Sequence, residues 1–382
     1  MIEVLTFFMF FVTVPLLVLT ISGYIKVRKH VNSLEHAVKQ KDEDLKLINE
    51  LGVEITSVLD IERLLPKIID AFARAGKVNK ASLMLLDEAT GVLEIKASLG
   101  LSSRAIEYVR PKLGEGIAGI AASTGKTMLI DDTSRDRVLY KEYIDGTTNP
   151  RPVESLLALP LIFKGKVIGV INLDSKITGE PFIRNDAKLL SILASQAAVA
   201  ITNAQLYNLA ITDGLTKLYI HRYFQMRLSQ EVDRAKRYNM PLTLIMLDID
   251  KFKVLNDTYG HQVGDLVLVS VSKAITATLR SSDIAARYGG EEFAVVLTET
   301  DIDDAVYVAE RLRKTVEDNV VEAGSDKVKA QISLGISSLI PSQKDVIDKD
   351  ELIRRADAAL YYSKQQGRNR YTVYDKIGDT KK

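Results

Sequence analysis

The feature that most restricts the fold of this chain is a Gly-Gly pair between two β-prone runs. Residues 283–288 precede Gly289-Gly290 and residues 293–297 follow it, a pattern typical of a tight hairpin. Glycine tolerates positive φ and has no side chain, so this turn would reverse the chain and let a ligand approach the backbone. Glu291 and Glu292 come next, and neighbours in a strand point to opposite faces. We therefore expect the two carboxylates to have different roles.

A second pair of acids ends a strongly apolar strand pattern. Residues 242–250 read Leu-Thr-Leu-Ile-Met-Leu-Asp-Ile-Asp, which puts Asp248 and Asp250 on one face at the strand's end. Beside the acidic hairpin, these carboxylates suit Mg²⁺ and a bound phosphate chain. A structural cluster of ion pairs is the alternative that the residues leave open.

Length and composition limit the classes of function. A chain of 382 residues is long enough for two domains and extra segments. The net charge of +1 gives no overall field that would recruit nucleic acid, and we expect no such partner. The chain has no cysteine, which excludes disulfides, thiolate metal sites and thioether-linked chromophores. No histidine lies between residues 50 and 205.

The N-terminal stretch Val4–Ile25 is uncharged and apolar. As a helix it would extend about 33 Å, enough to cross a bilayer core. Lys26, Arg28 and Lys29 follow it, so the positive-inside rule places the rest of the chain in the cytoplasm. We expect residues 1–26 to be a single-pass anchor in the cytoplasmic membrane. A cleaved signal peptide is the alternative, although residues 1–3 and 22–25 lack its basic start and small-residue cleavage site.

Residues 27–52 form a polar segment with a partial apolar seam. The seam continues to Leu59, and its apolar residues recur at intervals near three and four: Val31, Leu34, Val38, Leu45, Ile48, Ile55 and Leu59. Lys41 and Gly52 interrupt it. Such a seam favours a helix that pairs with another helix, and a simple amphipathic connector is the alternative.

Residues 53–185 have the pattern of a mixed α/β domain. We expect a helix over 61–75 and strands over 81–87, 93–98, 155–163 and 166–173. Lys164-Gly165 is typical of a hairpin turn between the last two strands. Gly114-Glu-Gly-Ile-Ala-Gly119 has the spacing of a dinucleotide fingerprint, but residues 108–113 before it are charged and interrupted by proline. We therefore interpret it as a turn that opens a helix.

This region resembles a GAF domain. The likeness is carried by Gly114–Gly119, Ile130-Asp131-Asp132, Ser155–Pro160, Val167–Leu173 and Phe182–Asp186. The resemblance implies either a small-ligand sensor or a dimerisation module. Ala187 replaces the glutamate typical of GAF domains that bind cyclic nucleotides, and the content of cysteine and histidine excludes bilin and histidine-ligated haem. We assign residues 53–205 to this domain.

Residues 186–211 have the pattern of one long helix that leaves this domain. Its heptad-like stripe comprises Leu190, Leu193, Ala197, Ala200, Ala204 and Tyr207, and alanine allows close approach of helices. We expect this stripe to form a parallel dimer stalk, with a terminal helix packed on its own domain as the alternative.

Six motifs in the remaining residues, 206–382, resemble the GGDEF domain of diguanylate cyclases in its Gly-Gly-Glu-Glu-Phe form. They are Asp213–Tyr219, Leu247–Lys253, Asn256–Asp265, Arg287–Phe293, Ser333–Gly335 and Ala356–Asn369. The resemblance implies a palm-like nucleotidyl cyclase fold with helices on a central antiparallel sheet. It also implies condensation of two GTP into cyclic di-GMP and two pyrophosphates. The expected fold class is thus a multidomain α/β (α+β) protein with an N-terminal transmembrane helix.

The resemblance assigns roles at the expected site. Asp248, the carbonyl of Ile249 and Glu291 would hold Mg²⁺, with Mn²⁺ as a possible substitute. Cations suit the charge that builds on the phosphoryl oxygens when a 3′-hydroxyl attacks the α-phosphorus. Phosphate-binding groups would be Lys253, Lys364, Arg368 and backbone amides near Lys251 and Phe252. For Lys364 and Arg368, a basic helix C-terminus is the structural alternative.

Two residues are expected to select guanine. The Watson–Crick edge of guanine presents two N–H donors, which the carboxylate of Asp265 would accept, while Asn256 can accept and donate. We expect Asp265 to be buried. Relatives that make mixed purine products have serine at its position. Glu292 or Asp250 would take the proton from the attacking hydroxyl, and Glu291 also belongs to this catalytic set.

Each such domain binds one GTP, so two subunits must meet, and the expected assembly is a homodimer. Arg280-Ser-Ser-Asp283, with Arg311, matches the family's inhibitory product site; a surface ion pair is the alternative. The chain departs from the family where Lys217, Ile220 and His221 replace Gly, Asn and Arg.

The leading hypothesis is a membrane-anchored, GAF-regulated diguanylate cyclase. A catalytically silent receptor for GTP or cyclic di-GMP is one alternative, which the presence of Asp248, Glu291 and Glu292 disfavours. A purine-promiscuous cyclase is the other, which Asp265 disfavours.

Overall fold

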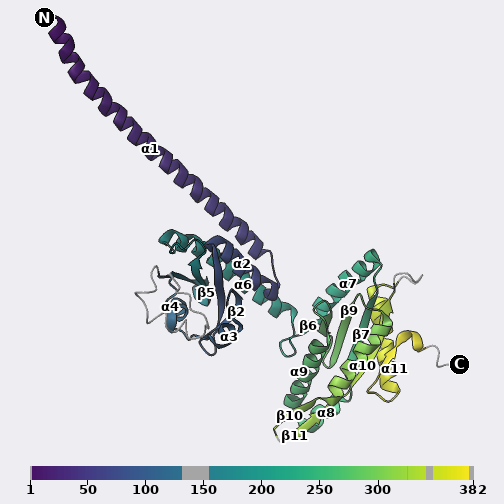
Figure 1. Ribbon diagram of the computed structural model, residues 1–382. Coiled ribbons are helices and arrows are strands. Elements are labelled where there is room, and N and C mark those ends of the chain that lie inside the picture. Colours follow the sequence, from purple (N-terminus) through teal and green to yellow (C-terminus); the bar gives the residue numbers. More distant parts are fainter. Residues whose placement is uncertain (1, 131–154, 325, 341–346, 378–382) are drawn as a thin grey trace. The chain divides into compact units, whose positions relative to one another are not determined.

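The computed structural model describes the backbone of residues 2–130, 155–324, 326–340 and 347–377, without the side chains of residues 2–23, 25, 36, 37 and 40 (Figure 1). The chain forms two compact units, Met1–Tyr207 and Asn208–Lys382. Both are mixed α/β, as expected, and each has its own core.

The first unit is built on a five-stranded antiparallel sheet with the order β2-β1-β5-β4-β3. Its strands are β1 (Val78–Asp87), β2 (Val92–Leu99), β3 (Met128–Ile130), β4 (Leu156–Phe163) and β5 (Lys166–Lys176). The hairpin predicted at Lys164-Gly165 is confirmed, with both residues at positive φ, 48° and 81°. Asp131 and Asp132, which follow β3, lie outside the described residues.

Helices cover both faces of this sheet. On one face α1 (Ile2–Thr56), α2 (Ile61–Gly76) and α6 (Arg184–Ile211) share a core, and α4 (Gly116–Thr124) packs on the other face; α3 (Ser103–Tyr108) is a short connector. The glycine-rich segment opens α4, as expected. A Cβ at Gly119 would strike the carbonyl oxygen of Lys112, so glycine is needed there for packing.

Helix α1 runs without a break through Lys41 and Gly52, the two residues that interrupt its apolar seam. Along its C-terminal part, Ile48 and Ile55 are buried in the core, whereas Val31 and Val38 earlier in the seam are exposed. A Cβ at Gly52 would overlap the side-chain amide of Gln196 on α6, so this glycine leaves room for that side chain. The expected seam is therefore divided between the core and an exposed face.

The prediction that the heptad-like stripe of α6 forms a dimer stalk is wrong for most of its residues. Five of its six residues are buried in the unit's own core: Leu190, Leu193, Ala197, Ala200 and Ala204. The reason is that α6 closes one face of the sheet beside α1 and α2, and that face takes the small and apolar residues. A different stripe, Ile192, Val199 and Leu206, is exposed at intervals of seven residues.

Helix α6 is also the one described helix long and apolar enough to cross a membrane. Its burial in the core makes it weak evidence for a span. Val4–Ile25 is helical as part of α1, but of its side chains only that of Tyr24 is described, so the membrane anchor stays a prediction.

The second unit has three layers around a six-stranded sheet of order β13-β12-β7-β9-β8-β6. Neighbouring strands from β12 to β8 are antiparallel, and β13 and β6 add parallel edges. The strands are β6 (Tyr219–Ile220), β7 (Leu242–Ile249), β8 (Ile284–Arg287), β9 (Glu292–Thr298), β12 (Ile332–Leu339) and β13 (Tyr371–Val373). A separate hairpin pairs β10 (Val320–Ala323) with β11 (Asp326–Lys329), and a short 3₁₀ helix spans Tyr374–Lys376.

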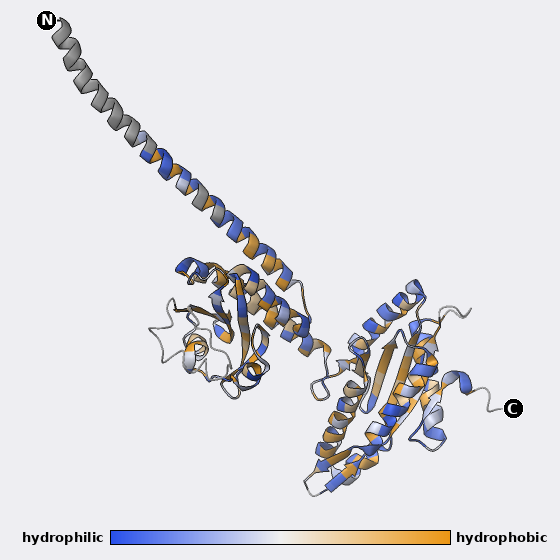
Figure 2. Cartoon of the chain, in the orientation of Figure 1, coloured by the Kyte–Doolittle hydropathy of each residue, from blue (hydrophilic) through white to orange (hydrophobic). Residues whose placement is uncertain are grey.

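Helices sandwich this sheet because side chains of β7 alternate between two cores. Ile245 and Leu247 face α8 (Phe252–Tyr259), α9 (His261–Thr278) and α10 (Ile302–Asp318). Leu244 and Met246 face α7 (His221–Tyr238) and α11 (Lys349–Gln365). Every residue of β7 is buried, and Figure 2 shows the apolar colours concentrated along the central strands. This rigid strand carries the acids that end it.

Candidate functional site

The end of β7 and the acidic hairpin lie side by side, as predicted. Asp248 pairs with Glu292 in the antiparallel register of β7 and β9, and the backbone N–H of Ile249 donates to the carbonyl of Glu291 at 3.3 Å. These backbone contacts, rather than side-chain chemistry, bring Asp248 next to Glu291. The carboxylates of two sequence segments therefore converge at one edge of the sheet.

The charges at this edge oppose one another. Burial raises the pKa of Asp248, as do the charges of Glu292 and Asp250, while Lys364 counteracts the shift. Partial burial and the charge of Asp248 likewise raise the pKa of Glu291. Lys364 Nζ lies 2.8 Å from Asp248 Oδ2, and the Asp248 side chain is only 8% exposed. An ion pair between Lys364 and Asp248 therefore exists, as the structural alternative supposed. The same lysine also offsets the charge of Glu291.

This donor set fits a magnesium ion. The described residues contain no group of three or more acidic, histidine or cysteine side chains placed to hold a metal. Mg²⁺ does not need one, because proteins commonly bind it through one or two carboxylates, with substrate phosphates and water completing the shell. Burial raises the pKa of both Asp248 and Glu291, with neighbouring carboxylates adding to each shift, so a divalent cation would stabilise their ionised forms.

The Gly-Gly hairpin forms where predicted, but positive φ is not the reason for its glycines, since neither has it. A Cβ at Gly289 would lie 2.6 Å from Glu292 Oε2, so this glycine makes room for that carboxylate. No heavy atom lies near the Cβ position of Gly290, which leaves open space there. Arg287 holds the turn by donating to the carbonyl of Gly290 at 2.7 Å and to Asp213 at 3.2 Å.

Asp250 has both carboxylate oxygens occupied. Ser333 Oγ donates to Oδ1 at 2.7 Å, and the backbone N–H of Asn369 donates to Oδ2 at 2.9 Å. These bonds join the end of β7 to β12 and to the loop after α11. Sequence reasoning gave no role to Ser333 or Asn369, although both stand in recognised motifs, because their partner is distant in sequence.

The residues expected to read guanine lie on neighbouring helices α8 and α9. Asn256 Oδ1 is buried without a hydrogen-bond partner among the described residues, and a Cβ at Gly264 would overlap it. Asp265, next to Gly264, is exposed, which contradicts the expectation that it is buried. It lies just after the first turn of α9, on the exposed side of the helix. Phe252 is buried at the start of α8 and Lys253 is exposed.

The two expected phosphate ligands flank the end of α11. Lys364 is in its last turn, and Arg368 follows in a loop, exposed and at a φ of 65°. The described contacts include no hydrogen bond or ion pair of the Arg368 guanidinium within the protein. Both cations are therefore on the same segment, one beside Asp248 and one directed to solvent.

The three residues of the expected inhibitory site occur around one turn. Asp283 accepts from the backbone N–H of Arg280 at 3.0 Å, and Arg311 on α10 donates to the carbonyl of Thr278 at 2.7 Å. Arg280 and Arg311 are exposed. Among the described contacts, Asp283 binds the backbone of Arg280 and no ion pair joins their side chains.

The departures from the family pattern lie beside the hairpin. Lys217 has a φ of 61°, a left-handed conformation that the family's glycine would adopt without strain. His221 packs edge-on against Tyr288, with ring centroids 4.4 Å apart. Among the described contacts, none joins Lys217, Ile220 or His221 to an expected ligand.

Comparisons with known proteins identify two domains. Residues 210–370 match the family described as diguanylate cyclase, GGDEF domain, and residues 58–202 match the GAF domain family. The chain is 40% identical over 219 residues to diguanylate cyclase A of Treponema denticola, a match covering 56% of this chain and 58% of that protein. It is 40% identical over 162 residues to diguanylate cyclase DosC of Escherichia coli, covering 42% of this chain and 35% of that one.

A solved structure, the GGDEF domain of DgcB from Caulobacter crescentus in complex with c-di-GMP, is 35% identical. That match covers 44% of this chain and 94% of the solved chain, with a TM-score of 0.41. The chain thus contains a GAF domain and a GGDEF domain, and it spans 58% and 35% of the length of the two curated relatives above.

Proposed function

We propose that this chain, which carries a GAF domain and a GGDEF domain, is a diguanylate cyclase that condenses two GTP into cyclic di-GMP and two pyrophosphates. The observation that carries the proposal is the convergence of Asp248, Glu291 and Lys364 where β7 meets the hairpin. A relative of the same domain family, 40% identical, bears the name diguanylate cyclase A.

In this proposal Asp248, Glu291 and the carbonyl of Ile249 hold Mg²⁺, or Mn²⁺ in its place. The metal would stabilise the negative charge that develops on the phosphoryl oxygens and the leaving pyrophosphate. Lys253, Lys364 and Arg368 bind the phosphates, and backbone amides at the start of α8, near Phe252, assist. Lys364 is already beside Asp248, so its ammonium group lies close to any phosphate bound at this edge.

The same geometry suggests which residues bind guanine and which carboxylate acts as the general base. The unpartnered oxygen of Asn256 suits an N–H donor of guanine, and the exposed carboxylate of Asp265 is free to accept a second one. For the general base we favour Glu292, because both oxygens of Asp250 already accept hydrogen bonds.

Two catalytic domains must face each other to join two nucleotides, so the proposed enzyme is a homodimer. The exposed stripe Ile192, Val199 and Leu206 on α6 supports pairing with a second copy, since intervals of seven are the period of a coiled coil. We further propose a cytoplasmic-membrane anchor at residues 1–26, a linker at 27–52, regulation by the GAF domain (53–205) of the catalytic domain (206–382), and product inhibition at Arg280, Asp283 and Arg311.

One experiment tests the activity. The full chain in detergent is incubated with Mg²⁺ and GTP, ATP or both, and products are identified by mass spectrometry. The proposal expects cyclic di-GMP from GTP and no product from ATP. Bound but unconverted GTP would indicate a silent receptor instead, and mixed dinucleotides would indicate a promiscuous cyclase.

A further inference from the structure

The loop that follows α11 has an unusual backbone. Gly367, Arg368 and Asn369 have φ values of 107°, 65° and 47°, so three consecutive residues lie in the left-handed region. Arginine is disfavoured there, and asparagine is tolerated better than most residues. Such a conformation persists only where surrounding contacts hold it. The contacts of Asn369 provide such a restraint.

Asn369 is bound on three sides. Its backbone N–H donates to Asp250 Oδ2 at 2.9 Å. Its Nδ2 donates to Glu317 Oε1 at 2.6 Å, and its Oδ1 accepts from Arg313 Nη1 at 2.9 Å. A flipped amide would place its N–H₂ against the arginine and its oxygen against the glutamate. The side chain thus has one favourable orientation.

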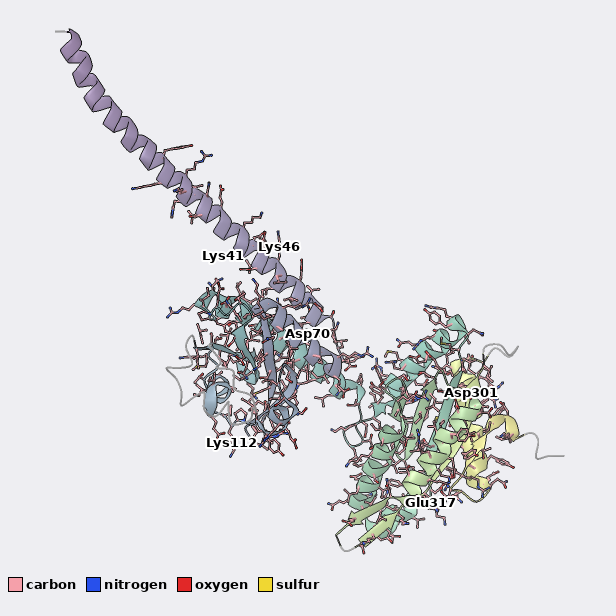
Figure 3. The ribbon with its side chains drawn as sticks, viewed as in Figure 1. Lys41, Lys46, Asp70, Lys112, Asp301 and Glu317 are labelled. Carbon is pink, nitrogen blue, oxygen red and sulfur yellow. The ribbon has the colours of Figure 1, made fainter. Side chains whose placement is uncertain are left out.

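Arg313 is itself held on α10. Glu310 accepts two hydrogen bonds from its guanidinium, both at 2.9 Å, and Glu317 accepts another at 2.7 Å. The Arg313 side chain is only 12% exposed, and Glu317 is labelled near the C-terminal end of α10 in Figure 3. The two acids accept three hydrogen bonds from the guanidinium, and a fourth goes to Asn369 in the loop.

We propose that Arg313 and Asn369 are positioning residues that hold the loop in the conformation from which Arg368 reaches the substrate phosphates. The inference rests on the proposed function, because it takes Arg368 as a phosphate ligand. A purely structural ion-pair cluster would stabilise α10 alone. Here the cluster instead ends on the residue next to Arg368, and the same residue binds Asp250 at the end of β7.

Three variants of the full chain in detergent test the inference. Asn369→Gly keeps the left-handed backbone accessible but removes the side-chain bonds. Arg313→Gln removes the charged fork, and Arg313→Lys keeps a charge for Glu310 and Glu317 while losing the geometry toward Asn369. Lys314→Gln is the matched control, since Lys314 is exposed and pairs with Glu310 on the same helix. We expect KM for GTP to rise about tenfold in the first two variants, with kcat within about twofold, because charge-assisted bonds of this kind are lost.

A mutant cycle separates positioning from general destabilisation. If Arg313 acts through Arg368, the double variant Arg313→Gln with Arg368→Ala binds a non-hydrolysable GTP analogue no more weakly than Arg368→Ala alone. Arg313→Lys should show the same rise in KM with a thermal midpoint close to that of the parent, which keeps the test valid if Arg313→Gln folds poorly.

Unchanged KM in Asn369→Gly and Arg313→Lys, or fully additive losses in the cycle, would overturn the inference while leaving the cyclase activity of the parent intact. A parent protein that neither binds GTP nor makes cyclic di-GMP would overturn both the proposed function and this inference.

Discussion

Lys364 Nζ lies 2.8 Å from Oδ2 of Asp248, so the last turn of α11 supplies the positive charge that faces the end of β7. A carboxylate as buried as that of Asp248 needs such a partner. Because Lys364 is also a proposed phosphate ligand, substrate and Asp248 would share one cation in the proposed enzyme. This arrangement makes the acids and the lysine interdependent.

The first prediction concerns the metal ligands. Asp248→Ala and Glu291→Ala should each lower the rate of cyclic di-GMP formation at least about a hundredfold, because a metal-binding oxygen that stabilises transition-state charge is lost. Removal of divalent cations with EDTA should abolish the activity of the parent, and added Mg²⁺ should restore it. Glu322→Ala, an exposed acid on β10, is the control. Parent-like turnover in either ligand variant contradicts the assignment.

The raised pKa of Glu291 predicts a dependence of stability on pH. Since burial and Asp248 raise this pKa in the folded state, the folded protein binds the proton more tightly than the unfolded chain. Ionised Glu291 therefore destabilises the ligand-free protein above its folded pKa, and the penalty disappears below the unfolded pKa. We expect Glu291→Gln to raise the thermal midpoint at pH 7 to 8, with the gain fading by about pH 4. A gain that is equal at both pH values would argue against this cause.

The third prediction concerns the selection of guanine over adenine. Asp265→Ser should lower kcat/KM for GTP about a hundredfold and allow products that contain adenine, because the acceptor for the guanine N–H groups is removed. Product analysis by mass spectrometry with equal GTP and ATP measures the change. Asp257→Ser on α8 serves as the control, an exposed acid outside the proposed contacts. Retained selectivity in Asp265→Ser would assign base reading to another group.

The fourth prediction addresses the dimer. Replacing Ile192, Val199 and Leu206 together by Gln should shift the full chain toward monomer and lower its specific activity, because these side chains are exposed at the period of a coiled coil. Ile183→Gln, an exposed apolar residue outside α6 and its stripe, is the control. Sedimentation in detergent over a range of protein concentrations reports the assembly. An unchanged mass and rate would place the dimer contact elsewhere.

Product inhibition supplies the fifth prediction. Arg280→Ala should raise the concentration of cyclic di-GMP needed for half-inhibition about tenfold or more, since loss of a charge-assisted contact weakens binding by this order. Inhibition curves with added product measure the shift, and Lys273→Ala on α9 is the control. Identical curves for Arg280→Ala and the parent would remove this site from the regulation.

The strands and the meeting of the acids could be predicted because they depend on local pattern. An apolar run that ends in Asp248 becomes a buried strand in any compact α/β unit, and a Gly-Gly pair between β-prone runs reverses the chain. The roles of Asp250 and Asn369 could not be predicted in this way. Their hydrogen bonds join residues 119 positions apart in the sequence, and only the packed sheet brings them within reach.

The sequence by itself determined the strand that ends in Asp248, the Gly-Gly hairpin beside it and the residue types at this edge of the sheet, because hydrophobic period and turn chemistry act over a few neighbours. Tertiary structure alone decided which stripe of α6 is buried, since a heptad of small residues packs equally well on its own sheet or on a second helix. It also decided that Gly289 gives space to Glu292 and that Asp265 is exposed. In each case the outcome depends on the volume and polarity of residues that are distant in the sequence, and a local sequence pattern carries no information about them.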